Sequence, residues 1–427
     1  MNGAVTLVLL VCGFILLSRK RLKESQLEGW LKESKSFYHR SSSANMNTEA
    51  PEPTTRWSVI IPARDEEANL AVLLPMLVSQ SEAPLDIIVV DDGSRDGTAS
   101  FAASQPGVTV IEAGPLPLGW RGKNWACSRG AELARGNRLL FLDADTRPAP
   151  QFIAAIGRTC VPGTCVTVQP WHEAGSFAER LSAFLNVAVL AGSGRFLAAL
   201  SGKRGSVLRD DQVQGEAAVH TSIRRSVQRA GKLGRSGGAF GPCLACTRAD
   251  YEAAGGHTSV KGEVLDHDRL AARMEQSGVR SMALLGGRLL KFRMYSGGLP
   301  DMTAGWAKSI ALGAGGSPRL ALLLMILWVC GLVGAASGLA GELVEAVSAL
   351  AGGAGADISG LVVSVLLYGL AAATAGAAWR FAGSFGRASA LLYPLHLLYF
   401  FIVFAYSLYR VYIRRSVSWK GRDLDVA

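Results

Sequence analysis

The sequence predicts an α/β domain built on a mainly parallel sheet and attached to a membrane by segments at both ends of the chain. Apolar runs of strand length alternate with helical patterns between residues 57 and 290, which is typical of a parallel sheet covered by helices. Long apolar runs lie before and after this domain. They raise the hydrophobic share of the 427 residues to 49% and the mean hydropathy to +0.24. Both values are high for a soluble enzyme.

The first apolar run predicts a transmembrane anchor over residues 1–18. Its core, "AVTLVLLVCGFILLS", is followed directly by "RKRLK", whereas a cleaved signal peptide carries its positive charge before the apolar run. Basic residues on the C-terminal side place the following chain in the cytoplasm. Residues 19–56 are expected to form a basic juxtamembrane segment and a flexible linker, because positions 36–56 are rich in Ser, Thr and Pro.

Three strand-like runs organise the central domain, which we place at residues 57–290. "WSVIIP", "LDIIVVDD" and "RLLFLDAD" each end in Pro or Asp, and helical patterns such as "EEANLAVLLPMLVSQ" and "NWACSRGAELARG" lie between them. Ligands of parallel sheets bind beyond the carboxyl ends of the strands, so we expect polar chemistry at that edge. Residues 192–238 are rich in Gly and Arg and predict an inserted flexible segment, either one that touches anionic lipid or a plain disordered loop.

The C-terminal part of the chain predicts about three transmembrane helices within residues 319–411. Their Gly and Ala content suits helix packing in lipid, and the apolar runs cover roughly 319–341, 358–379 and 389–411. The tail at 412–427 is strongly basic and so belongs on the cytoplasmic side, yet the parity of one anchor plus three spans puts it outside. The number of spans therefore stays open: one run is re-entrant or interfacial, or the charge rule fails here.

An interfacial segment is expected at residues 291–318, just before the apolar runs. It carries Tyr295, Trp306 and Lys308 in "MYSGGLPDMTAGWAKS". The segment either feeds a lipid acceptor to the catalytic domain or serves as an aromatic anchor at the membrane surface.

Charge and cysteine usage exclude two classes of protein. The net charge is +10, but no basic motif is interleaved with aromatic residues, so we expect no nucleic acid partner and favour anionic phosphates of lipids or of a nucleotide donor. The seven cysteines are odd in number, and two lie in apolar membrane-like runs, which argues against a disulfide framework. Cys243 and Cys246 form a lone C-x-x-C pair, which we interpret as packing thiols rather than a zinc or redox site.

The carboxylates that follow the third strand-like run are the first candidate site. Asp143 and Asp145 in "LLFLDADT" are two residues apart, so both can reach one point beyond the strand. Two carboxylates together with diphosphate oxygens suit Mg²⁺ or Mn²⁺, which would neutralise charge on a departing diphosphate. The alternative is a strand-to-turn cap with solvated side chains.

Three further charged groups lie just after a strand-like run or at the start of a helix. The acidic cluster at 65–67 opens a helix after the first run, where it also complements the helix dipole. Asp91 and Asp92 end the second run, where an Asp accepts a hydrogen bond from a uracil N–H or a ribose hydroxyl, or forms an Asx turn. Lys123 stands at a helix start and can meet a phosphate, although an ordinary exposed lysine is the alternative.

Taken in order, "VIIPARDEE", "VVDDGS", "GKNWA" and "LFLDAD" resemble the nucleotide-sugar half of the family 2 glycosyltransferases, which have the GT-A fold, over residues 58–150. "PLPLGWRGKNWA", "YEAAGGH", "GEVLDHDRLAARM", "MYSGG" with "GWAKS", and a terminal "WKGR" are similar to the membrane-bound branch that acts on carotenoid or hopanoid-type lipids. The resemblance implies a Rossmann-like catalytic domain, a UDP-sugar donor and a divalent metal, Mg²⁺ or Mn²⁺.

The resemblance also implies roles for single residues. Asp92 would contact the uracil, and Lys123 would lie near the nucleotide or its diphosphate. Asp143 and Asp145 would hold the ribose and the metal. The residues expected to bind the donor are thus Pro62, Glu66, Asp92, Lys123 and Asp143.

The stretch "GEVLDHDRLA" is the candidate for the catalytic base. The family takes its base from an acidic E-D pair shortly before x-x-L-A, and here that pair falls on Asp266 and His267. His267 therefore occupies the usual Asp position, so Asp266, His267 and Asp268 are all candidates. Local sequence alone favours Asp266 as the N-cap of a helix that stops at Gly278. We do not expect a zinc site at this trio, because no further ligand-spaced residues accompany it.

The apolar runs and the charge pattern predict a multi-pass membrane protein with a cytoplasmic catalytic domain in the inner or plasma membrane. The resemblance implies that it is an inverting hexosyltransferase that would move glucose from UDP-glucose to a lipophilic isoprenoid such as a carotenoid. The alternatives are a polyprenyl-phosphate or polysaccharide glycosyltransferase and a catalytically inactive membrane protein that binds nucleotide sugars. The sequence lacks the Q-x-x-R-W motif of processive members, which argues against polymer synthesis. The first strand leads into "PARDEE" rather than a glycine-rich loop, which excludes a dinucleotide oxidoreductase.

Overall fold

A computed structural model describes residues 3–17, 56–194, 239–295, 297–353, 358–414, 416–419 and 422–425. The predicted linker within 19–56, nearly all of the predicted insertion at 192–238 and the last residues of the basic tail lie outside the described residues. The chain divides into two compact units. The sheet unit falls within Lys23–His172 and Gly205–Met294, and the helical unit falls within Met1–Leu22, Glu173–Arg204 and Tyr295–Ala427.

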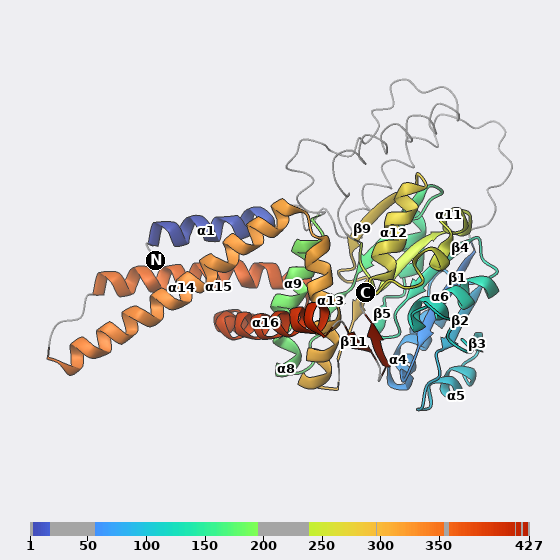
Figure 1. The fold of residues 1–427 in the computed structure, drawn as a ribbon, viewed down its shortest axis with the longest axis horizontal. Coiled ribbons are helices and arrows are strands. Elements are labelled where there is room, and N and C mark those ends of the chain that lie inside the picture. Colours follow the sequence, from blue (N-terminus) through green and yellow to red (C-terminus); the bar gives the residue numbers. More distant parts are fainter. Residues whose placement is uncertain are drawn as a thin grey trace, which may run out of the picture. The chain divides into compact units, whose positions relative to one another are not determined.

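A seven-stranded sheet forms the centre of the sheet unit (Figure 1). Its order is β3-β2-β1-β4-β8-β6-β9, and neighbouring strands are parallel except where β8 pairs with β4 and β6. The predicted α/β class with a mainly parallel sheet is therefore confirmed. The strands are β1 (Trp57–Ala63), β2 (Asp86–Asp91), β3 (Val108–Glu112), β4 (Arg138–Leu142), β6 (Thr164–Gln169), β8 (Cys243–Thr247) and β9 (Arg280–Leu285). A small second sheet joins β5 (Thr146–Pro148), β10 (Leu290–Phe292) and β7 (Trp171–His172).

The strand registers bring three strand ends to one edge of the large sheet. Ala63 at the end of β1 is level with Asp91 at the end of β2, and Ile60 in β1 is level with Phe141 in β4. Asp143, two residues beyond Phe141, therefore lies beside the end of β1. The polar residues that follow these strands gather where a doubly covered parallel sheet binds its ligands.

Helices cover both faces of the large sheet. Val59 and Ile61 of β1 pack into one core, with α4, α5 and α7, while Ile60 packs into the other, with α6, α11 and α12. Cys243 and Cys246 of β8 fall into different cores, because residues three apart on a strand point to opposite faces, and they act there as packing thiols. The helices are α4 (Glu67–Val78), α5 (Thr98–Ala103), α6 (Gly122–Leu133), α7 (Phe152–Thr159), α11 (Arg248–Ala253), the 3-10 helix η2 (Gly256–Val260) and α12 (Asp266–Gln276).

A buried carboxylate ties the start of β2 to β1 and to the chain before β4. Asp86 accepts hydrogen bonds from Ser58 Oγ at 2.7 Å and from the main-chain N–H of Arg135 at 2.9 Å. Ser58 Oγ in turn accepts the N–H of Gly136 at 2.8 Å. Burial alone would raise the pKa of Asp86, but the hydrogen bonds from Ser58 and Arg135 reverse this and lower it.

Replacing Asp86 by Ala should reduce the free energy of unfolding by about 2 kcal/mol at neutral pH, because the donors on Ser58 and Arg135 lose their partner. The pKa of Asp86 is lower in the folded chain than in the unfolded one. Its contribution is therefore present above the unfolded pKa and is lost as the pH falls through the folded value, so wild type and variant should converge in acid. Denaturation followed by tryptophan fluorescence measures this. Glu112→Ala, at an exposed position of β3, is the control and should stay within about 0.5 kcal/mol.

Within its described residues, the helical unit holds three helices that are long and apolar enough to cross a membrane, and they can be followed in Figure 1. They match the three apolar runs of the sequence: α14 (Arg319–Ala351), α15 (Ile358–Ala382) and a continuous stretch, Ala388–Ile413. That stretch consists of the 3-10 helix η3 (Ala388–Leu392), α16 (Tyr393–Leu408) and the π-helical η4 (Tyr409–Ile413). Many of their large apolar side chains are exposed, as expected for helices in contact with lipid. The chain is therefore membrane-associated.

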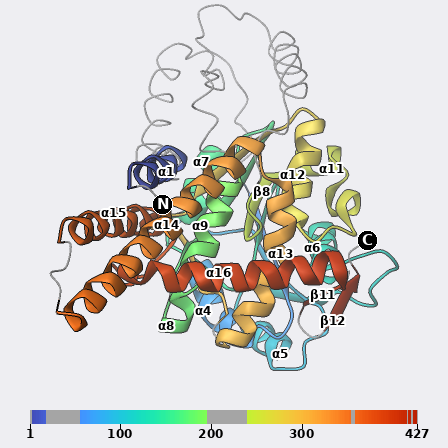
Figure 2. The same cartoon turned by 60° about the vertical axis from the view of Figure 1, so that its left-hand side comes forward.

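The first helix, α1 (Gly3–Leu16), packs along α14 and α15 (Figure 2). Close approach depends on two glycines. A Cβ on Gly13 would lie 2.2 Å from Cδ1 of Trp328, and one on Gly331 would lie 3.0 Å from the main-chain nitrogen of Leu10. Small residues at such contacts are typical of helix packing in membranes. The helical unit also contains α8 (Phe177–Arg180), α9 (Ala183–Gly192), α13 (Leu299–Gly316) and the hairpin of β11 (Ser416–Trp419) with β12 (Arg422–Asp425).

Candidate active site

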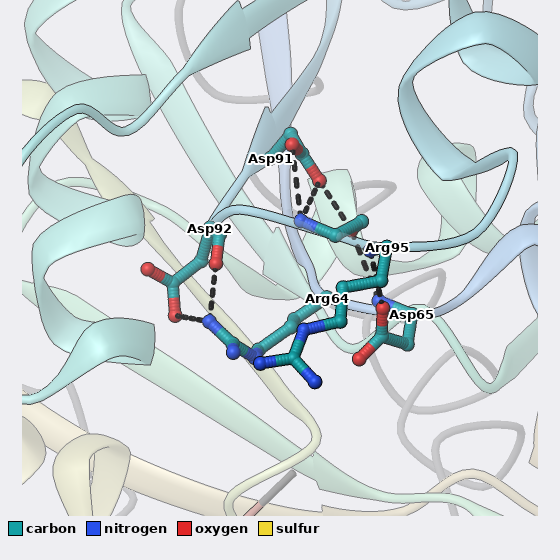
Figure 3. Close-up of polar contacts among 6 residues, drawn as sticks. Arg64, Asp65, Asp91, Asp92 and Arg95 are labelled. Atoms are coloured by element: carbon teal, nitrogen blue, oxygen red, sulfur yellow. Dashed lines mark hydrogen bonds and ion pairs between the residues drawn. The ribbon is translucent and has the colours of Figure 1, made fainter. Parts of the chain in front are cut away.

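The loops after β1 and β2 are braced against each other (Figure 3). Arg64 donates from Nη1 to the main-chain oxygen of Asp92 at 2.6 Å, and the same atom lies 3.7 Å from Asp92 Oδ2. Asp65 has a left-handed φ of 52° and accepts the main-chain N–H of Arg95 at 2.7 Å. Asp91 accepts the main-chain N–H of Ser94 at 3.2 Å, three residues further on, which closes the turn after β2. These contacts hold the two loops in one conformation at the carboxyl edge of the sheet.

The structure therefore shows how the predicted donor-binding residues of this region are held. The Asp92 side chain is only 4% exposed and faces Arg64. Glu66 precedes α4, its N–H donates to Thr98 Oγ1 at 2.8 Å, and its carboxylate accepts from the Asn69 amide. Pro62 lies inside β1, one residue before the strand ends. The contact of Asp92 with a uracil base stays a prediction, and so do donor contacts of Pro62 and Glu66.

Lys123 joins two of the predicted site residues. It lies in the first turn of α6, and its Nζ is 2.7 Å from Asp143 Oδ1 and 3.3 Å from Asp266 Oδ2. Burial would lower the pKa of Lys123, but the two carboxylates more than compensate, so its pKa is raised and the ammonium stays charged. Burial would likewise raise the pKa of Asp266, yet Lys123 holds it well below its usual range. A cation thus bridges the end of β4 and the start of α12.

The main chain around Asp143 and Asp145 forms a fixed turn. The N–H of Asp143 donates to Pro242 O at 3.0 Å, and Thr146 Oγ1 donates to Asp143 O at 2.7 Å. The main-chain oxygen of Asp145 accepts the N–H of Arg293 at 3.1 Å. Both carboxylates are partly exposed at the sheet edge. Two aspartates held there provide the oxygen ligands that Mg²⁺ and Mn²⁺ prefer, so these residues fit such an ion.

The three candidate bases at the start of α12 point to three different places. Asp266 faces Lys123. His267 is 1% exposed, and its Nδ1 donates to the main-chain oxygen of Gly241. Asp268 accepts the N–H of Ala239 at 2.9 Å. Successive helical residues are rotated by about 100°, which separates the three side chains although they are adjacent in sequence.

The prediction that Asp266 caps this helix is wrong. Leu265 is the N-cap residue, Asp266 is the first helical residue, and no side chain caps the helix. The Asp266 carboxylate instead forms an ion pair with Lys123 at the sheet edge. The helix ends at Gln276 and is followed by Gly278 with φ of 94°, as the glycine predicts.

Sequence reasoning missed two residues that contact this region. Cys127 lies one helical turn after Lys123 on α6, and His257 lies in η2, and both are fully buried. The only sequence signal for Cys127 is its spacing of four from Lys123. His257 carries no local signal, because the fold and not the spacing brings it to α12.

Comparison with known proteins assigns the family. Residues 58–227 match the model of Glycosyl transferase family 2. The chain is 28% identical over 377 residues to a 4,4'-diaponeurosporenoate glycosyltransferase of Staphylococcus aureus, covering 87% of this chain and 88% of that protein.

Two solved structures show weaker similarity. A mannosyltransferase from Pyrobaculum calidifontis is 17% identical, with a TM-score of 0.39, and the match covers 95% of this chain and 96% of that one. Glucosyl-3-phosphoglycerate synthase from Mycobacterium tuberculosis is 20% identical, with a TM-score of 0.35, over 62% of this chain and 80% of that one. Scores this low carry no weight, so the assignment depends on the family match, the curated relative and the sheet itself. The chain is a glycosyltransferase whose residues 58–227 match family 2, and its mainly parallel, helix-covered sheet agrees with the GT-A fold predicted for the catalytic domain.

Proposed function

We propose that this glycosyltransferase moves a hexose, glucose from UDP-glucose, to a lipophilic isoprenoid acceptor such as a carotenoid, with inversion at the anomeric carbon. The observation that carries the proposal is the position of Lys123 between Asp143 and Asp266. It joins the edge of the sheet where a nucleotide donor would bind to the helix that carries the candidate base.

The donor side of the site is assigned to the loops after β1, β2 and β4. Asp143 and Asp145 would hold Mg²⁺ or Mn²⁺, and this ion would neutralise negative charge on the departing UDP. Lys123 starts α6, where its ammonium and the free N–H groups of the helix start favour phosphate. Asp92, fixed by Arg64, would accept a hydrogen bond from the uracil.

Asp266 is the best placed of the three candidate bases. The Nδ1 of His267 is engaged by the main-chain oxygen of Gly241, and Asp268 is engaged by a main-chain N–H. Asp266 shares Lys123 with Asp143, so its carboxylate lies beside the donor region. A diphosphate that binds Lys123 would weaken the Lys123–Asp266 pair and make Asp266 a stronger base. Asp266 would then take the acceptor proton while UDP leaves on the opposite face of the sugar, which inverts the configuration.

The acceptor is assigned from the membrane helices and the curated relative. The name of that relative specifies a carotenoid acid as the compound it glycosylates, and the match covers 87% of this chain. Three helices able to cross a membrane suit an enzyme whose acceptor dissolves in lipid. Basic residues after the first apolar run would place the catalytic domain on the cytoplasmic side of the inner or plasma membrane, where nucleotide sugars are made.

A transfer assay tests the proposal. Membranes that contain the full chain are incubated with radiolabelled UDP-glucose, Mg²⁺ or Mn²⁺, and a carotenoid acid or alcohol. Label should enter the organic phase as a glycosylated carotenoid of inverted configuration. A chelator should stop the reaction, and added Mn²⁺ should restore it. Matched membranes with Asp266→Asn supply the background.

Two results would contradict the proposal. Label in a polyprenyl phosphate or a polymer, with none in carotenoid, would favour the alternative glycosyltransferase class. No labelled lipid with any UDP-sugar and metal would refute the proposed donor, and GDP-mannose is then the next donor to compare.

A further inference from the structure

Three buried ligand-type side chains meet behind the proposed active site. The Sγ of Cys127 and one ring nitrogen each of His257 and His267 all lie within 4.8 Å of one another. None of the three side chains is more than 1% exposed. They come from α6, η2 and α12. More than a hundred residues separate α6 from η2 in the sequence. The site is distinct from the exposed carboxylates Asp143 and Asp145.

The hydrogen bonds of the two histidines leave their Nε2 atoms for a ligand. The Nδ1 of His267 faces the main-chain oxygen of Gly241, which can only accept, so Nδ1 carries the proton and Nε2 carries a lone pair. The Nδ1 of His257 is 2.9 Å from Tyr251 Oη, which also accepts the main-chain N–H of His257. The tyrosine oxygen can accept from Nδ1 as well. Both Nε2 atoms are buried and have no hydrogen-bond partner.

Two buried ring nitrogens without hydrogen-bond partners reduce the stability of the fold. A buried polar atom without a partner costs about 1–3 kcal/mol, and the two histidines that carry these atoms lie in one cluster with the Cys127 thiol. Histidines that bind a metal through one nitrogen usually donate the other N–H to a carbonyl or similar oxygen, which is the arrangement at His267. Burial keeps both imidazoles neutral, lowering the pKa of His257 to about 3 and also lowering that of His267. Neutral imidazole is the form that binds metal.

We propose that Cys127, His257 and His267 form a buried zinc site that fixes the active-site helices. One thiolate and two imidazoles suit Zn²⁺ and do not suit Mg²⁺ or Mn²⁺, which prefer oxygen. The nitrogen and sulfur ligands of a tetrahedral Zn²⁺ lie about 3.3–3.7 Å from one another. The ligand atoms here lie within 4.8 Å of one another, so the three side chains would have to approach one another by about 1 Å to bind the ion. On binding, the Cys127 thiol loses its proton to solvent and a sulfur–zinc bond forms. These three ligands leave one position of a tetrahedral ion for a fourth ligand.

The site would position the two groups on which the proposed reaction depends. Cys127 follows Lys123 by one turn of α6, and His267 adjoins Asp266 on α12. A metal that joins α6 to α12 therefore holds the Lys123–Asp266 pair at its spacing. It would also give the histidine at position 267, where the family resemblance expects aspartate, a role as a metal ligand.

Metal content of the purified full-length protein tests this inference independently of any transfer activity. The protein is purified in detergent, dialysed against buffer without chelator, and assayed by mass spectrometry for zinc. We expect about one zinc per chain. After exchange into Co²⁺, the wild type should show the intense visible bands of a tetrahedral site and a thiolate-to-cobalt band in the near ultraviolet. Both signals should disappear in Cys127→Ser and His257→Gln.

Matched controls separate this site from the carboxylates and from general damage to the core. Cys160→Ser removes another fully buried thiol, and Asp143→Asn alters the proposed magnesium or manganese site, and both should keep the zinc. The fold of each variant is checked by circular dichroism. A folded wild type without zinc and without a cobalt spectrum would overturn the inference. Zinc that persists in both Cys127→Ser and His257→Gln would overturn it equally.

Discussion

Replacing Asp266 by Asn should lower kcat for sugar transfer by at least about a hundredfold, while the affinity for UDP changes only a few-fold. The amide keeps the shape of the side chain but cannot take the acceptor proton, and general-base catalysis typically contributes 10²–10⁴-fold. UDP binding should survive because Lys123, no longer shared with Asp266, is free to meet the diphosphate. Steady-state kinetics with saturating carotenoid, together with titration of UDP, separate the two effects.

The neighbouring residues of α12 are the controls for this result. Asp268→Asn should keep kcat within about tenfold, because that carboxylate accepts a main-chain N–H and would do so as an amide. His267→Gln should alter zinc content and stability more than the proton-transfer step. A variant set in which Asp268→Asn is inactive and Asp266→Asn is active would move the base to Asp268.

Replacing Lys123 by Met should have the second large effect, on both activity and stability. The change leaves the carboxylates of Asp143 and Asp266 without the cation that lies 2.7 and 3.3 Å from them. Breaking a buried ion pair by removing one partner costs about 3–5 kcal/mol, and the partial exposure of Asp143 puts the expected loss near the lower figure. The KM for the UDP-sugar should rise and kcat should fall, each by about tenfold or more. Unfolding by denaturant and steady-state kinetics measure these quantities.

A double-mutant cycle distinguishes the electrostatic role from simple loss of packing. Lys123→Met combined with Asp266→Asn should recover part of the lost stability, because the variant no longer contains an unpaired carboxylate at position 266. It should remain inactive. Lys123→Arg keeps the charge and should retain most of the stability. If the two single changes were strictly additive in unfolding free energy, the 3.3 Å contact would carry no energetic coupling.

The sheet and the membrane helices could be predicted from sequence because both follow from periodicity. "WSVIIP", "LDIIVVDD" and "RLLFLDAD" each contain an unbroken apolar core, since β1, β2 and β4 are covered on both faces. The acidic residues that follow these runs in the sequence indicate the edge of the sheet at which the carboxyl ends of the strands lie. Three apolar runs of membrane length likewise appear as three long helices. In both cases the signal lies within a few consecutive residues.

The arrangement of the site could not be predicted because it depends on contacts between distant residues. Asp266 looks like a helix cap in its local sequence, and only Lys123, 143 positions earlier, shows why it turns elsewhere. His267 appeared to lack companions for a metal. Its companions are His257, one turn and a short loop away, and Cys127 on another helix, and neither lies at a recognisable ligand spacing.

The order of elements along the chain has a consequence for biosynthesis. Glu173–Arg204 belongs to the helical unit but is translated between β7 and β8 of the sheet unit. The ribosome therefore delivers α9 before the strands that complete the large sheet, and α9 is almost entirely apolar. Its Phe184 stacks on Trp328 and packs at a tilt against Phe400, and both of these residues are made much later. Until β8 is made, β6 has no neighbouring strand to join it to β4, and α9 lacks its aromatic partners until α14 and α16 have been translated.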